Sequence, residues 1–219
     1  ILAAGLYLFL VYAGISPPVA SFVAVLYSFN TYLFGVIVWY VFNTNDALAL
    51  IFLLLGFWAM LERRWTVFGA ALLIGALARE TWILLPPTAL VYLWERRLLR
   101  GQWARLAVAT LPAAAAAAGL RICLSADLPG NLDPFSAFLQ FAPRALTLEF
   151  WARQFGNSLK PLTFLPLVFF GPTRDYFRAN KYVAVFVLLT TASTLFASGN
   201  ERLMAPAFIV FYWLFALII

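Results

Sequence analysis

Long runs of apolar residues, separated by short clusters of charged residues, proline and glycine, are the feature that most limits what this 219-residue chain can fold into. Hydrophobic residues make up 64% of the chain and charged residues only 11%, whereas a soluble domain carries about 25% charged residues. Too few charges remain to cover the surface of a water-soluble globule. The sequence therefore predicts that most of the chain lies in lipid.

In hydrocarbon each apolar run must be a helix, because backbone polar groups have to form their hydrogen bonds within their own segment. The sequence thus predicts an all-α, polytopic transmembrane helical bundle that forms a single transmembrane domain over 1–219. It has about nine hydrophobic segments, which are 1–12, 19–42, 46–61, 65–78, 82–94, 106–124, 161–170, 182–197 and 203–219. Since both ends of the chain lie inside apolar stretches, we expect a fragment of a longer protein.

The charged residues of the connections predict an orientation in the membrane. Sorted alternately, the connections around 62–64, 95–105 and 174–181 carry nine basic and three acidic residues, and the other side carries six of each. By the positive-inside rule the first side is cytoplasmic. Its basic runs are expected to contact anionic lipid head groups. No aromatic or glycine-rich pattern accompanies them, so no nucleic-acid partner is predicted.

Two connections on the opposite, extracytoplasmic side are unusual. The segments 65–78 and 82–94 span only about 20 Å each, whereas the hydrocarbon core is about 30 Å thick. The turn between them is therefore expected to lie below the outer membrane surface. The stretch 125–160 is the only long polar connection, and its interspersed Phe and Trp residues predict short helices at the membrane interface. Long connections of this kind are usually functional.

The chain contains no histidine and one cysteine, Cys123. Histidine acid-base chemistry, histidine metal sites, an intrachain disulfide and any multi-cysteine metal site are therefore excluded. Acid-base work falls to carboxylates. No residue of this chain is expected to bind a metal ion.

Charged groups at membrane depth are costly and by default indicate function. On the extracytoplasmic side they gather at predicted helix ends, as Asp46, the pair Arg79 and Glu80, and the pair Glu201 and Arg202. Each also has a structural interpretation, since an acid at a helix start or a base at a helix end complements the helix dipole. Both interpretations stay open at this point.

Three strings resemble bacterial members of the GT-C superfamily, which are multi-spanning glycosyltransferases that use polyprenyl-phosphate sugars. They are Asn45-Asp46-Ala47-Leu48-Ala49-Leu50, Gly75-Ala76-Leu77-Ala78-Arg79-Glu80-Thr81 and Glu201-Arg202-Leu203-Met204-Ala205-Pro206. The resemblance implies an active site on the extracytoplasmic face of the bacterial inner membrane. It also implies that 1–12 matches the family's second helix. The first helix and the loop bearing the catalytic base would then precede Ile1, so the catalytic residue is unknown, and any divalent cation would bind through that missing loop.

Sugar transfer needs a carboxylate to deprotonate the acceptor and a cation to stabilise the leaving phosphate. The planar guanidinium of arginine suits the second task, so Arg79 and Arg202 are the first candidates for the donor phosphate, with Arg153 and Lys160 behind them. Asp46, Glu80 and Glu201 complete the expected substrate-binding set. The expected partners are the polyprenyl-phosphate donor and membrane lipids. A lipid or sugar flippase and a non-catalytic membrane subunit remain the alternatives.

Overall fold

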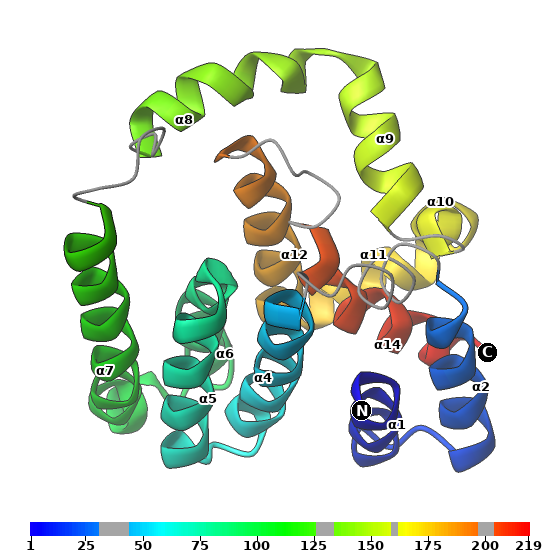
Figure 1. Ribbon diagram of the computed structural model, residues 1–219. Coiled ribbons are helices and arrows are strands. Elements are labelled where there is room, and N and C mark those ends of the chain that lie inside the picture. The colour runs from blue at the N-terminus through cyan, green and yellow to red at the C-terminus, as the bar shows by residue number, and fades with distance from the viewer. Residues whose placement is uncertain (31–43, 126–133, 159–161, 197–203) are drawn as a thin grey trace.

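The computed structural model describes residues 1–30, 44–125, 134–158, 162–196 and 204–219, and within these ranges every regular element is helical. The all-α prediction is thus confirmed (Figure 1). The α-helices are α1 (Leu2–Tyr12), α2 (Pro17–Ser28), α4 (Thr44–Leu61), α5 (Trp65–Ala78), α6 (Leu85–Glu95), α7 (Leu99–Ser125), α8 (Pro134–Phe141), α9 (Leu148–Ser158), α10 (Leu165–Val168), α11 (Phe170–Ala179), α12 (Lys181–Ser193) and α14 (Phe208–Ile218). Short 3-10 turns join several of them, namely η3 (Glu80–Leu84), η4 (Ala142–Leu146), η5 (Leu162–Phe164), η6 (Thr194–Phe196) and η7 (Ala205–Ala207).

One described helix is long and apolar enough to cross a membrane by itself. This is the 22-residue part of α7 over Leu99–Leu120, in which 11% of an 18-residue apolar window is buried. The apolar stretches of the other described helices have 10 to 17 residues. The structure therefore shows an all-α chain but does not show nine spanning helices.

Several predicted boundaries differ from the structure. The segment 161–170 is not one helix: α10 ends at Val168, Phe169 leaves the helical region with φ −112° and ψ 48°, and α11 then begins. Helix α7 begins at Leu99, inside the basic stretch that we expected to be a loop. Arginine, glutamine, alanine and leucine favour helix there, and a single Gly101 does not outweigh them. In the segment 19–42, α2 ends at Ser28, and residues 31–42 lie outside the described ranges.

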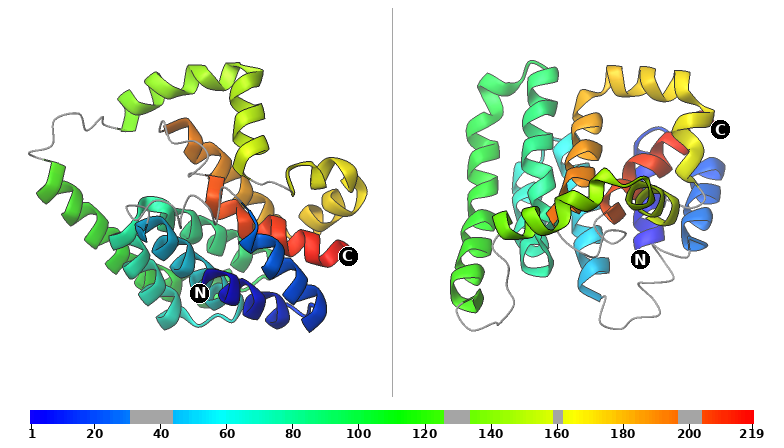
Figure 2. Two further views of the ribbon diagram at one scale, coloured as in Figure 1. Left: turned by 45° about the vertical axis from the view of Figure 1, so that its right-hand side comes forward. Right: turned by 90° about the horizontal axis from the view of Figure 1, so that it is seen from above.

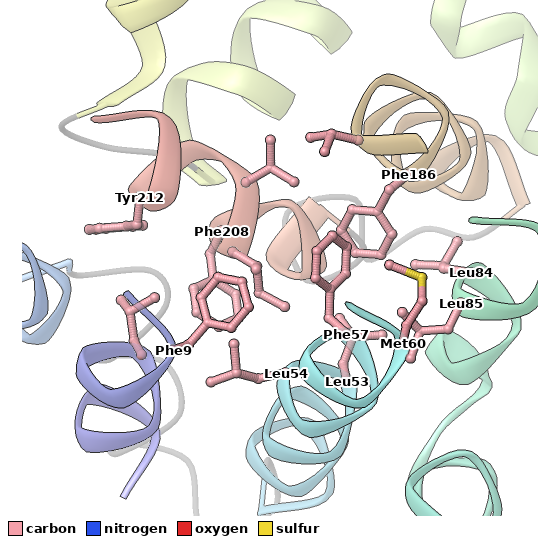
Figure 3. Packing of buried hydrophobic residues seen from close by; sticks show 14 of the residues in the cluster. Phe9, Leu53, Leu54, Phe57, Met60, Leu84, Leu85, Phe186, Phe208 and Tyr212 are labelled. Atoms are coloured by element: carbon pink, nitrogen blue, oxygen red, sulfur yellow. The ribbon is translucent and has the colours of Figure 1, made fainter. Parts of the chain in front are cut away.

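The core combines aliphatic and aromatic side chains of helices that are distant in sequence (Figure 3). Phe57 of α4 is fully buried. Its ring lies 6.1 Å from that of Phe9 in α1 and 5.4 Å from that of Phe186 in α12. Trp213 of α14 stacks edge-on against Phe9 at 5.4 Å. Such rings tie four helices together, and truncating a buried Phe typically costs about 3–5 kcal/mol.

The connections that follow α1, α4 and α6 lie at one end of the molecule, at the bottom of Figure 1. There the Tyr12 hydroxyl donates to Glu62, and the backbone N–H of Lys181 donates to Glu95 at 3.2 Å. The ammonium group of Lys181 lies 5.5 Å from the centre of the Trp94 ring. The structure therefore gathers three clusters of basic residues, 62–64, 95–97 and 178–181, at this end. We call it the basic end.

Helices α8 and α9 arch over the opposite end of the molecule (Figure 1). They lie at the same end in the left view of Figure 2. Helix α9 reaches the rest of the chain through Phe155, which packs against a small buried cluster of Met204, Ala207 and Phe211. The short helices that the aromatic residues of 125–160 predict are thus present.

Candidate functional site

The structure brings together two charged residues that the sequence singles out separately. The guanidinium of Arg79, at the end of α5, donates through Nη1 to Oδ1 of Asp46, in the first turn of α4. Both side chains are largely withdrawn from solvent, with exposed fractions of 20% for Arg79 and 12% for Asp46. They form an ion pair between residues 33 positions apart in sequence.

Local structure places each of these charges at a helix end. Asp46 lies near the positive end of the α4 dipole, and Arg79 follows the last helical residue of α5, where it complements the negative end. Arg79 itself is extended, with φ −167° and ψ 158°, because the chain leaves α5 there and enters η3. The side chain can therefore turn away from its own helix toward α4.

The ion pair lies short of the far end of α7. Helices α5 and α7 run in the same direction, with Trp65 Nε1 donating to Gln102 Oε1 at 2.8 Å and Gly69 lying against Ala109. These two contacts place Ala78 level with residues 115–118, and α7 continues to Ser125. At 1.5 Å per residue the turn after α5 lies about 10–15 Å below that end. The turn is thus recessed relative to the end of α7, and its depth below a membrane surface stays a prediction.

The other predicted site residues are not shown beside this pair. Glu80 follows Arg79 directly, opens η3 and is exposed. Arg153 lies in α9, but its side chain is outside what the structure describes. Lys160, Glu201 and Arg202 lie outside the described residues. The geometry therefore supports a site of Asp46 and Arg79, with Glu80 at its edge.

Within the described ranges no three His, Cys, Asp or Glu side chains come close enough together to hold a metal ion. Cys123 is exposed. The arrangement of Asp46 and Arg79 is instead suited to an anion, because a guanidinium has five N–H donors and the bond to Asp46 leaves others for a phosphate oxygen.

Sequence reasoning missed one buried polar contact. Asn30, just after α2, is 1% exposed, and its Nδ2 donates to the hydroxyl of Tyr212 in α14 at 3.1 Å. Tyr27 packs edge-on against the Tyr212 ring at 5.5 Å. A polar residue inside the apolar segment 19–42 was the available signal, but nothing in the sequence indicated its partner 182 positions away.

Comparison of the chain with models of protein families, with curated protein sequences and with solved structures finds no match. The interpretation of the site therefore depends on its own geometry and on the resemblance of the strings given above.

Proposed function

We propose that this chain is an integral-membrane glycosyltransferase of the GT-C type, which moves a sugar from a polyprenyl-phosphate donor to an extracytoplasmic acceptor. The observation that carries the proposal is the largely buried ion pair of Asp46 and Arg79, at the end of the bundle opposite the basic end. In this proposal the apolar segments form a polytopic bundle in the bacterial inner membrane, and the active face is extracytoplasmic.

Outward-facing apolar side chains support a lipid environment. Leu77 of α5, Val108 of α7 and Leu188 of α12 are 59%, 68% and 67% exposed. Such residues occur on most of the described helices. A soluble monomer rarely exposes contiguous apolar patches of this kind, since each would remain in contact with water. In lipid the same side chains meet a solvent that suits them.

Two arginines at the basic end support its cytoplasmic placement. Arg63 and Arg97 follow α4 and α6, and each has a φ of +58°. Glycine is the usual residue at such a helix end, and the left-handed conformation costs another residue about 1–2 kcal/mol. A requirement for positive charge at both turns explains why arginine stands there, as the positive-inside rule demands.

In the proposed reaction Arg79 binds the donor phosphate and stabilises the charge that develops on it as the glycosidic bond breaks. Asp46 holds the guanidinium in place. The recess below the end of α7 brings the phosphate to the level of these two side chains, and α8 and α9 cover the sugar and the lipid chain. No residue named here is assigned the role of catalytic base.

The test separates a functional ion pair from a structural one in the membrane-embedded protein. Asp46→Asn and Arg79→Gln each break the ion pair, and breaking a fully buried pair costs about 3–5 kcal/mol. The double variant leaves no lone charge, so its membrane yield and thermal stability should recover. Transfer from polyprenyl-phosphate sugars to membrane acceptors should stay about 10²–10³-fold below that of the unmodified protein, because the stabilising guanidinium is missing.

Arg100→Gln is the matched control, since this exposed arginine lies at the start of α7 near the basic end. It should leave transfer unchanged. Normal transfer by the double variant would show that Asp46 and Arg79 only complement the dipoles of their helices. Movement of the donor lipid between leaflets without any sugar transfer would favour the flippase.

A further inference from the structure

An open apolar groove runs between α1 and α4 on the outer surface of the bundle. Its volume is about 370 Å³, within the range of about 300–1,000 Å³ typical of small-molecule sites. Leu8 and Leu55, which line it, are 65% and 36% exposed. Gly5 also lines it, and the absence of a side chain there keeps α1 close to Leu54. The groove follows the 11 residues of α1, a length of about 16 Å.

At the basic end, the groove finishes in two aromatic rings and an arginine. Tyr12 and Trp58 line this end, with ring centres 6.1 Å apart. The guanidinium of Arg64 lies 5.3 Å from the centre of the Trp58 ring, and its side chain is 59% exposed. Arg63 stands beside it. The apolar groove thus ends next to two exposed arginines.

Glu62 offsets only one of these two charges. Its Oε1 accepts the hydrogen bond of the Tyr12 hydroxyl, and its Oε2 forms a salt bridge of 4.0 Å with Nε of Arg64. The turn of Glu62, Arg63 and Arg64 therefore keeps a net positive charge at the mouth of the groove. The rings of Tyr12 and Trp58 suit a membrane interface, because each of these side chains has an apolar body and a polar group.

We propose that this groove binds one anionic phospholipid, with an acyl chain along α1 and α4 and the head-group phosphate at Arg63 and Arg64. The inference depends on the membrane location proposed above but not on sugar transfer. The charge at the groove mouth selects a phospholipid with a net negative head group over a zwitterionic one, because each basic residue near an anionic head group strengthens binding by about fivefold.

The experiment uses the protein reconstituted in vesicles of phosphatidylcholine. Phosphatidylglycerol or phosphatidylcholine with brominated acyl chains is then added, since bromine quenches tryptophan fluorescence on contact. The difference between the protein and its Trp58→Phe variant isolates the quenching of Trp58. We expect brominated phosphatidylglycerol to quench Trp58 at lower mole fractions than brominated phosphatidylcholine.

Two variants with matched controls assign the effect to the groove. Arg64→Gln should weaken the apparent affinity for phosphatidylglycerol about fivefold, whereas Arg100→Gln should not. Leu8→Phe partly fills the groove and should reduce quenching by both lipids, whereas Leu188→Phe, on an exposed position of α12, should not. Equal quenching by the two lipids, equal effects of variants and controls, or no quenching of Trp58 because another segment covers the groove would overturn the inference. Sugar transfer can be measured on the same samples, so failure here is distinguishable from failure of the proposed function.

Discussion

Gly69 allows α5 and α7 to approach so closely that no side chain fits between them. A Cβ atom built at this position would lie 2.9 Å from the carbonyl oxygen of Ala109 and 3.2 Å from its Cα. Ordinary contact begins at 3.4 Å. The obstacle is backbone and cannot rotate away, so Gly69→Ala must separate the two helices by about 0.5 Å, the shortfall in the shorter contact. Overpacking of this kind costs about 1–3 kcal/mol.

Helix propensity acts in the opposite direction and has to be removed from the comparison. Alanine is about 0.8–1.0 kcal/mol better than glycine inside a helix. Gly119 of α7 supplies the control, because an added Cβ there meets nothing within 4 Å. Gly119→Ala should therefore gain only the propensity term. The difference in unfolding free energy between the two variants isolates the steric term, and we expect Gly69→Ala to be lower by about 1–3 kcal/mol.

The assay is reversible unfolding of the purified protein in detergent, followed by tryptophan fluorescence. Since α5 also carries Arg79 at its end, separating it from α7 should disturb the ion pair with Asp46. Under the function proposed above, Gly69→Ala should then lose more transfer activity than folded protein. Equal stability of the two variants would refute the close approach of α5 and α7.

Four further predictions concern single residues. Tyr176→Phe should leave stability unchanged or raise it, because its buried hydroxyl has no partner among the described residues and burial raises the pKa of this phenol far above its ordinary value. Tyr212→Phe, which removes the hydrogen bond from Asn30, should cost about 0.5–1.5 kcal/mol in the same unfolding assay. Arg97→Gly should stabilise the protein by up to about 1 kcal/mol because it relieves the positive φ, whereas Arg96→Gly, at a φ of −81°, should not. Single cysteines at Arg100 and Leu146, in a background without Cys123, should be labelled from opposite sides of the membrane, and labelling of both from one side would contradict the proposed topology.

The helix boundaries that sequence reasoning placed correctly are those with strong local signals. Helix α5 covers 65–78 as predicted, because Arg63 and Arg64 precede its apolar run and Arg79 follows it. Asp46 lies in the first turn of α4 as expected, since an acidic residue is favoured there. In both cases the residues that set the boundary lie within a turn of it, so no tertiary contact was needed.

The predictions that failed used apolarity alone or charge alone. Apolarity alone suggested one helix over 161–170, but the chain bends at Phe169, between α10 and α11. Charge alone suggested a loop before residue 106, but the first turns of α7 pack against α5, where Trp65 donates to Gln102. A long basic side chain can keep its charge in water while its helix continues. A cluster of charges therefore need not mark a helix end.

The geometry of a helical hairpin is enough to predict that Asp46 and Arg79 lie close together, although the sequence singles them out as separate charges. Two antiparallel helices joined by a tight turn bring together residues that lie equally far from that turn, since both helices rise by 1.5 Å per residue. Asp46 lies 16 residues before Glu62, and Arg79 lies 16 residues after Arg63. With the turn at Glu62 and Arg63, α4 and α5 must bring these two charges to one level. Opposite charges at that level can pair only if they also face each other, and this rotation about the helix axes is what the structure adds.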